Sequence, residues 1–196
     1  MTRNWPLVLG LVAGLLAVWA GQQAGSDPIE GWQLAARWTA RVGFPIFILT
    51  YAASSLAKLW PGALTRGLWQ DRRWWGLGFA VCHTVHLYAL ITFNRMAGHD
   101  TSTQTLIGGG GAYAILYLMA FTSNDAAMRA LGRNWKRLHR LGIHWLWFVF
   151  AFSYFGRIVE GREMPYAGFA FAISLAALSL RIVVWVKGRR VRAATA

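Results

Sequence analysis

Six apolar stretches fill most of this 196-residue chain and leave little sequence for anything other than membrane-spanning helices. They cover about Trp5–Gly21, Val42–Leu59, Trp74–Phe93, Leu106–Thr122, Leu138–Phe155 and Tyr166–Val186. A helix needs about 20 apolar residues to cross a bilayer, and most of these stretches approach that length. We therefore predict an all-α integral membrane protein, folded as a six-transmembrane-helix bundle.

Composition indicates the same class of protein. Hydrophobic residues make up 56% of the chain and charged residues 14%, whereas soluble domains carry about 25% charged residues. The one cysteine, Cys82, excludes a disulfide framework and the paired cysteines of covalent c-type haem attachment. We predict a single transmembrane domain over residues 1–196, with a basic, frayed tail at 187–196. The first stretch is interpreted as a retained span and not as a cleaved signal peptide.

The placement of the cations predicts the orientation of the bundle. The net charge is +13, but in a membrane protein the distribution of Lys and Arg over the loops matters more than their sum. One side carries Arg3, Lys58, Arg66, Arg72, Arg73, Arg129, Arg133, Lys136, Arg137, Arg140, Lys187, Arg189, Arg190 and Arg192. The other side carries Arg37, Arg41, Arg95, Arg157 and Arg162 beside five acidic residues. The positive-inside rule then predicts cytoplasmic termini, a tail that contacts an anionic leaflet, and no nucleic-acid partner.

The segments between the stretches have their own signals. Gly21–Ala36 is predicted to be a polar outer loop and Leu64–Arg73 a short basic inner loop. Ser123–Arg137 is compatible with a helix, and Ser123-Asn124-Asp125 is suited to cap it. The four glycines Gly108–Gly111 are interpreted as small residues that allow a helix or cofactor to approach closely.

Four histidines lie in or at the edge of the predicted spans: His83 and His86 in the third, His139 and His144 in the fifth. The remaining one, His99, lies in an outer loop. An imidazole in hydrocarbon is costly and usually functional. Because two spans each carry a pair, we predict that a haem iron is ligated between them, with these four residues as candidate ligands.

Depth in the membrane ranks the possible ligand pairs. At 1.5 Å per residue, counted from the arginines that precede each span, His83 lies about 15 Å deep and His86 about 20 Å. On the same scale His139 lies about 3 Å deep and His144 about 10 Å. The closest match is His83 with His144. The hypothesis is therefore one haem held by His83 or His86 together with His144.

Other interpretations of the same residues remain open. The histidines can instead hydrogen-bond to neighbouring helices. A proton relay would recruit acidic residues, and the predicted spans contain none, while zinc lacks a tetrahedral ligand set. Arg41, Arg95 and Arg157 are placed to bind haem propionates at the outer span ends, although interface snorkelling explains them equally well. A haem-free scaffold, a small transporter and a haem-based sensor with Cys82 as its redox group are the rival classes.

Short motifs along the chain resemble the ferric-reductase-like transmembrane superfamily. Within it, they are most similar to the haem-binding membrane subunit of the bacterial periplasmic methionine-sulfoxide reductase system. The matching motifs are Asp27-Pro28, Thr39-x-Arg41, Arg72-Arg73-x-x-Gly76-Leu77, His86-Leu87, Ala120-Phe121-Thr122-Ser123, Leu131-Gly132, Leu138-His139 and Tyr166-Ala167-Gly168.

The resemblance implies a multi-pass protein of the bacterial inner membrane that binds haem b and passes electrons to a periplasmic redox partner. The donor would be a cytoplasmic reductase or quinol, with flavin or quinone as the external carrier. The protein would then be a redox subunit. The resemblance points to His86 and His139 as ligands and to Arg72 as a cofactor-binding residue.

One part of the family pattern is missing. The family has a further histidine about thirteen residues after the one that matches His139, where this chain reads Ala151-Phe152-Ser153-Tyr154. His83 and His144 are additional to the pattern. One haem is therefore predicted, with a second at His139 as the alternative.

Overall fold

A computed structural model describes residues 4–100 and 102–194, and all regular structure in these two ranges is helical. Arg3, one of the cations in the charge comparison, lies outside them. The elements in chain order are α1 (Trp5–Ala24), α2 (Pro28–Leu59), α3 (Ala63–Gln70), α4 (Arg72–Met96), α5 (Thr103–Thr105), η1 (Leu106–Gly110), α6 (Gly111–Phe121), α7 (Asp125–Leu131), α8 (Arg133–Val159) and α9 (Met164–Ala194). The all-α prediction is confirmed.

Among the described residues, five helices are long and apolar enough to cross a membrane. A sixth candidate is the pair Leu106–Phe121 and Asp125–Leu131, which is bent by 104° and has the form of a broken span or a re-entrant loop. The predicted fourth span, Leu106–Thr122, is the part of this pair before the bend. It begins as the π-helix η1 and continues as α6. A Cβ at any of Gly108–Gly111 would meet no described atom outside its own helix within 4 Å, so the close helix approach predicted there is not found, and the close approach of a cofactor stays a prediction.

The predicted outer loop over Gly21–Ala36 is wrong. Only Gly25–Asp27 separate α1 from α2, and α2 begins fourteen residues before the predicted span. Asp27 explains the early start, because its Oδ1 accepts hydrogen bonds from the backbone N–H groups of Ile29 (2.8 Å) and Glu30 (2.9 Å). This is N-terminal capping, and Pro28 is well suited to the first helical position.

The two predicted basic loops also contain helix. Leu64–Arg73 was expected to be a loop, but α3 occupies Ala63–Gln70. The tail was expected to be frayed, but α9 continues to Ala194, in sequence that contains no proline after Pro165. The predicted cap is confirmed at Asn124, whose Oδ1 accepts a hydrogen bond from the N–H of Ala127 (2.8 Å) at the start of α7.

The described chain divides into two compact units. Unit 1 contains residues 4–47 and 73–142 apart from residue 101, and unit 2 contains residues 48–72 and 143–194. The helices α2, α4 and α8 contribute to both units, because the divisions fall inside them. Unit 1 contains His83, His86, His99 and His139, and unit 2 contains His144.

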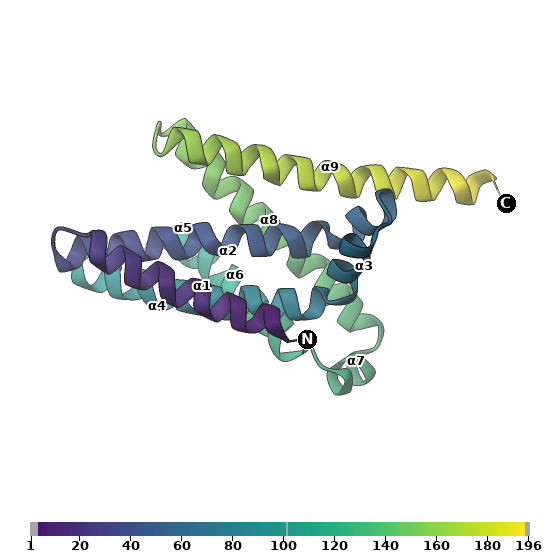
Figure 1. Cartoon of the computed structure of the whole chain (residues 1–196), viewed down its shortest axis with the longest axis horizontal. Coiled ribbons are helices and arrows are strands. Elements are labelled where there is room, and N and C mark those ends of the chain that lie inside the picture. Colours follow the sequence, from purple (N-terminus) through teal and green to yellow (C-terminus); the bar gives the residue numbers. More distant parts are fainter. Residues whose placement is uncertain (1–3, 101, 195–196) are drawn as a thin grey trace. The chain divides into compact units, whose positions relative to one another are not determined.

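Glycines let α1 and α4 pack closely in unit 1 (Figure 1). A Cβ at Gly10 would lie 2.1 Å from the carbonyl oxygen of Gly78, so the two backbones are in contact there. Gly14 meets Val85 further along, which shows that α1 and α4 run parallel. Gly21 packs against the backbone of Ala35, and α2 returns antiparallel to α1.

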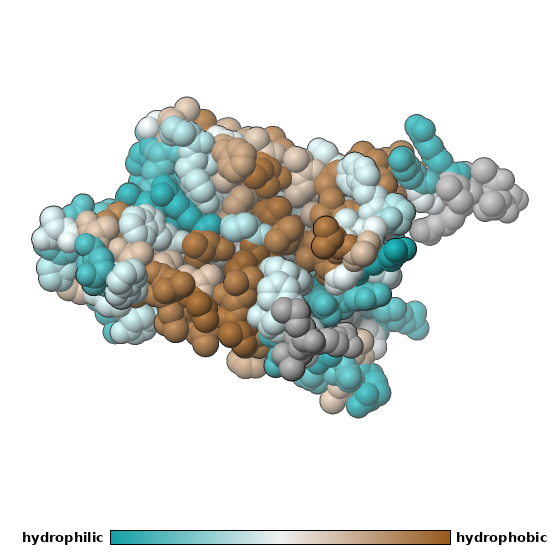
Figure 2. Space-filling view, in the orientation of Figure 1, coloured by the Kyte–Doolittle hydropathy of each residue, from teal (hydrophilic) through white to brown (hydrophobic). Residues whose placement is uncertain are grey.

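The outer face of α1 is apolar and exposed. Figure 2 shows hydrophobic side chains along this helix and hydrophilic ones at the α1–α2 turn. The exposed large apolar residues of α1 are Trp5, Val8, Leu9, Leu11, Val12, Leu15, Leu16 and Trp19. Exposure of a continuous apolar helix face of this length is unfavourable in water and favourable in contact with lipid.

In unit 2, α8 and α9 form an antiparallel pair. The indole Nε1–H of Trp147 donates to the carbonyl oxygen of Ser174 (2.9 Å). Nearer the connection, the rings of Phe155 and Phe171 lie 5.7 Å apart. An ion pair between Arg157 and Glu163 (2.9 Å) closes the turn. One predicted propionate-binding arginine, Arg157, therefore has a local partner.

Candidate functional site

Unit 1 brings His83 and His86 together on one face of α4, with ring centroids 5.2 Å apart. Residues three positions apart lie on the same side of a helix, so the sequence predicted this pairing. Their environments differ. His83 is buried and His86 is half-buried.

His83 is packed against the backbone of α2. A Cβ at Gly43 would lie 2.7 Å from its Nδ1 and 2.8 Å from its Cε1, so the imidazole occupies the space that a side chain at position 43 would need. The ring of Phe79 lies 4.3 Å away, and the hydroxyl of Tyr113 donates to the carbonyl oxygen of His83 (3.3 Å). This histidine fills an aromatic core where α2, α4 and α6 meet.

His86 is hydrogen-bonded to Thr39 of α2, with its Nδ1 3.0 Å from the Thr39 Oγ1. The hydroxyl of Thr39 also lies 2.7 Å from the carbonyl oxygen of Ala35 and 3.0 Å from that of Ala36. Carbonyl oxygens only accept, so the single hydroxyl proton is directed to them. Oγ1 therefore accepts from His86, whose Nδ1 carries the ring proton and whose Nε2 carries the lone pair.

This tautomer is the one that a metal-ligating histidine needs. Such a histidine usually donates its second ring N–H to an oxygen, which fixes the ring and makes the ligating nitrogen more basic. In His86 that second nitrogen is Nδ1, and the nitrogen with the lone pair is Nε2, which is less hindered because it is farther from Cβ. The residues around His86 therefore fit a haem iron ligated through Nε2.

His139 has the opposite arrangement at the start of α8. Its Nε2 lies 3.2 Å from the Thr122 Oγ1, and that hydroxyl donates to the carbonyl oxygen of Leu118 (2.6 Å). Oγ1 must then accept from His139, so the proton is on Nε2 and the lone pair is on Nδ1. The ring also stacks on Trp135, with centroids 4.1 Å apart. In this state His139 does not fit a haem iron ligated through Nε2.

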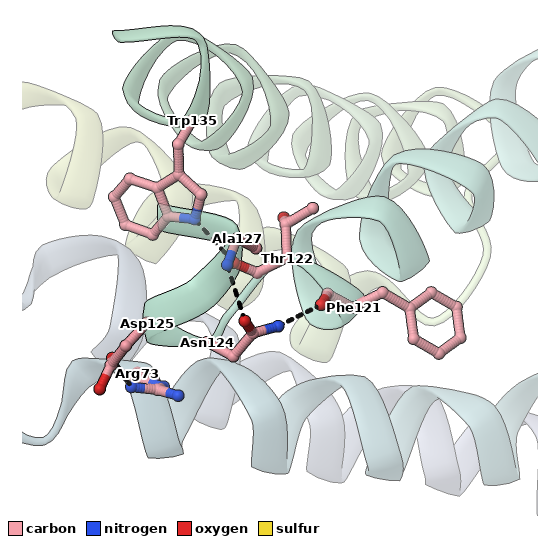
Figure 3. A network of polar contacts seen from close by, with 7 residues as sticks. All are labelled: Arg73, Phe121, Thr122, Asn124, Asp125, Ala127 and Trp135. Atoms are coloured by element: carbon pink, nitrogen blue, oxygen red, sulfur yellow. Dashed lines mark hydrogen bonds and ion pairs between the residues drawn. The ribbon is translucent and has the colours of Figure 1, made fainter. Parts of the chain in front are cut away.

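The neighbours of His139 form a structural network around the α6–α7 bend (Figure 3). The Nε1–H of Trp135 donates to the carbonyl oxygen of Thr122 (2.8 Å), and the side-chain amide of Asn124 donates to that of Phe121 (2.8 Å). Arg73 at the start of α4 pairs with Asp125 at 2.8 Å. These contacts tie α4, α6, α7 and α8 together.

His144 lies in unit 2, further along α8. Its Nδ1 is 3.1 Å from the hydroxyl of Tyr51, and the two rings are perpendicular at 88° with centroids 5.5 Å apart. Because Nδ1 faces Tyr51, Nε2 is directed to the opposite side of the ring. His144 therefore also has a hydrogen-bonded Nδ1, but its partner is a phenol that can donate as well as accept.

The two arginines predicted to bind cofactor occupy different settings. Arg41 is half-buried on α2, two residues after Thr39. Arg72 is exposed at the start of α4, where its Nη1 donates to the carbonyl oxygen of Trp69 (2.9 Å) and its guanidinium lies over the Trp69 ring. Arg72 belongs to unit 2 and Arg41 to unit 1.

Thr39 and Tyr51, which hydrogen-bond to His86 and His144, and Arg181, which contacts Tyr51, were not among the predicted site residues. Thr39 was noticed only as part of a motif, and Tyr51 not at all. Arg181 was counted as a charge inside the last span, and an intramembrane cation is a signal of function that deserved more weight. Its guanidinium lies 4.4 Å from the ring centroid of Tyr51.

Within residues 4–100 and 102–194, no group of three or more His, Cys, Asp or Glu side chains is placed to hold a metal ion. A haem iron does not need such a group, because the porphyrin supplies four ligands and the protein one or two. No known protein-family model and no solved structure matches the chain. The assignment of the site therefore depends on the geometry of the histidines.

Proposed function

We propose that this protein is a b-type cytochrome of the membrane that carries single electrons, with His86 as a ligand of its haem iron. The hydrogen bond from His86 Nδ1 to Thr39 carries this proposal, because it fixes the tautomer that leaves Nε2 able to bind iron. His86, His139 and His144 each have an identified hydrogen-bond partner at one ring nitrogen, and the partner of His86 is the one that favours the ligating tautomer.

Haem b, when bound, supplies one-electron redox chemistry. The residues of this chain have separate tasks around it. Thr39 holds the Nδ1 proton of His86 and sets the plane of its ring. His83, Phe79 and Tyr113 form a buried aromatic wall beside it, which keeps water from that side of the ligand.

We propose a single haem. His139 is engaged through Nε2 with Thr122, which argues against a second haem at that position. The second ligand is proposed to be His144, which the one-haem hypothesis from the sequence pairs with either His83 or His86. Variants distinguish these assignments. Loss of the low-spin spectrum in His144→Ala but not in His139→Ala supports them, and the reverse result contradicts both.

An optical spectrum tests the function itself. Protein purified in detergent from membranes is expected to show a sharp α-band after dithionite reduction, with about one haem per chain by pyridine haemochrome assay. Its reduction in membrane vesicles by a quinol or by reduced flavin identifies the donor. A preparation that consistently lacks haem, even after expression with added haem precursor, would exclude the cytochrome and favour the haem-free scaffold or small transporter.

The bundle is proposed to lie in the bacterial inner membrane with both termini in the cytoplasm. The support is the concentration of Lys and Arg on one side of the predicted spans. Alkaline phosphatase fused after Ala196 is expected to be inactive, since it folds only in the periplasm. The same enzyme fused within the His99 loop is expected to be active. Activity of the first fusion with inactivity of the second would reverse the orientation.

The resemblance further supports electron delivery from a cytoplasmic reductase or quinol to a periplasmic acceptor of the methionine-sulfoxide reductase class. Reduced haem in sealed vesicles should be reoxidised when such an acceptor is present on the periplasmic side. No reoxidation from that side, with rapid reoxidation from the other, would contradict this direction of transfer.

A further inference from the structure

Arg181 lies in the apolar sequence of α9, seventeen residues after the helix begins. A guanidinium in such a segment is expensive unless its partners compensate the charge. Both of its identified partners are parts of one residue, Tyr51 of α2. Its Nη1 donates to the Tyr51 carbonyl oxygen (2.9 Å), and its charge lies 4.4 Å above the Tyr51 ring. The cation is therefore fixed at one point of unit 2.

Tyr51 is held from the other sides as well. Its side chain is fully buried, at 0% exposure, and its ring stacks on Trp147 with centroids 6.3 Å apart. Trp147 is itself tied to α9 through its hydrogen bond to Ser174 (2.9 Å). The phenol therefore cannot turn away without breaking contacts with both α8 and α9.

The hydroxyl of this fixed ring meets Nδ1 of His144 at 3.1 Å. The contact does two things to the imidazole. It sets the ring plane, which lies at 88° to that of Tyr51. It also links the imidazole, through the same buried ring, to the permanent positive charge of Arg181.

We propose that Arg181 and Tyr51 are a positioning pair that holds the ring of His144 in one orientation and raises the reduction potential of the iron that His144 ligates. The proposal rests on the proposed haem function. A nearby cation destabilises ferric iron relative to ferrous iron, because ferric iron carries one more positive charge. Tyr51 transmits the orientation, and Arg181 supplies the charge.

The test is a redox titration of the haem protein with three variants. Arg181→Gln keeps hydrogen-bonding capacity and removes the charge, Arg181→Lys keeps the charge, and Tyr51→Phe keeps the ring and removes the hydroxyl. At the wild-type midpoint potential, the ferrous-to-ferric ratio of Arg181→Gln is expected to fall about tenfold, which is a shift of about 59 mV towards negative values for a one-electron couple. Arg181→Lys should stay near the wild type.

Tyr51→Phe gives an independent readout, because it leaves the charge in place. Its electron paramagnetic resonance g-values are expected to change, since these report the orientation of the ligand plane. The inference is overturned if Arg181→Gln keeps both haem and the wild-type potential, or if Arg181→Lys shifts as far as Arg181→Gln. If Arg181→Gln fails to fold, unchanged g-values in Tyr51→Phe overturn the inference, and altered ones support it.

These outcomes separate the inference from the proposed function. If the wild-type protein contains haem and the variants have unchanged properties, the cytochrome proposal stands and the proposed roles of Arg181 and Tyr51 are excluded. If the wild-type protein contains no haem, the cytochrome proposal and the inference are both excluded. A normal spectrum in His144→Ala overturns the inference and the assignment of His144 as a ligand but leaves the cytochrome itself standing, because the iron then has other ligands.

Discussion

Replacement of His86 by alanine is expected to remove the low-spin haem spectrum from the purified protein. The Nε2 of this residue is proposed to bind the iron, and alanine has no group that can replace it. Haem per chain in the pyridine haemochrome assay should fall to background, or to a residual high-spin species if the other ligand retains the haem. The effect should exceed that of any substitution that leaves both ligands in place.

The matched control is His99→Ala. His99 is an exposed histidine in the loop after α4, and its ring makes an edge contact with the ring of Phe93. Its replacement should leave haem content and spectrum unchanged. A second comparison is His83→Ala, which removes the neighbouring imidazole from the aromatic core and is expected to lower stability more than haem affinity. A native spectrum in His86→Ala would show that His86 is not a ligand.

The helices were predictable from hydropathy, but their boundaries were not. Apolar runs report which residues favour lipid, whereas a helix continues for as long as its backbone hydrogen bonds and caps allow. The sequence before Val42 is polar, yet α2 already begins at Pro28 because Asp27 caps it. Polar and basic residues likewise continue α9 beyond Val186.

The histidines of the candidate site were predictable, but their partners were not. Imidazoles in apolar sequence are visible without a structure. The oxygen that fixes His86 comes from Thr39, 47 residues earlier, and the one beside His144 comes from Tyr51, 93 residues earlier. No spacing rule within a helix reaches over such distances.

Depth and hydrogen bonding rank the histidines differently, and the reason is physical. Counting 1.5 Å per residue favours His83 as the match for His144. That count locates an imidazole along the helix axis but does not say what its nitrogens contact. Gly43 admits the His83 ring against the α2 backbone, whereas Thr39, one helical turn earlier, offers His86 an oxygen. The chemistry of the neighbouring helix is therefore the reason for proposing His86 as the ligand in preference to His83.

The hydrogen bond between Thr39 and His86 makes a second prediction with a large effect. Thr39→Val keeps the shape of this fully buried side chain and removes the oxygen that accepts the Nδ1 proton. Loss of such a partner of a metal-ligating histidine typically costs about 10–100-fold in affinity. Haem should therefore dissociate more readily from Thr39→Val, as measured by transfer to a haem-scavenging apoprotein.

The direction in which the haem midpoint potential shifts shows whether the hydrogen bond between Thr39 and His86 is responsible. An Nδ1–H that donates to an oxygen makes the ligating nitrogen more basic, which stabilises ferric iron. Thr39→Val should consequently move the midpoint potential towards positive values, opposite to the shift expected of Arg181→Gln. Thr39→Ser keeps the hydroxyl and should resemble the wild type. Thr92→Val is the matched control, because it removes a hydrogen bond to the Tyr88 carbonyl oxygen within α4. Equal haem loss in Thr39→Val and Thr92→Val would mean that the threonine acts on the helices in general and not on His86.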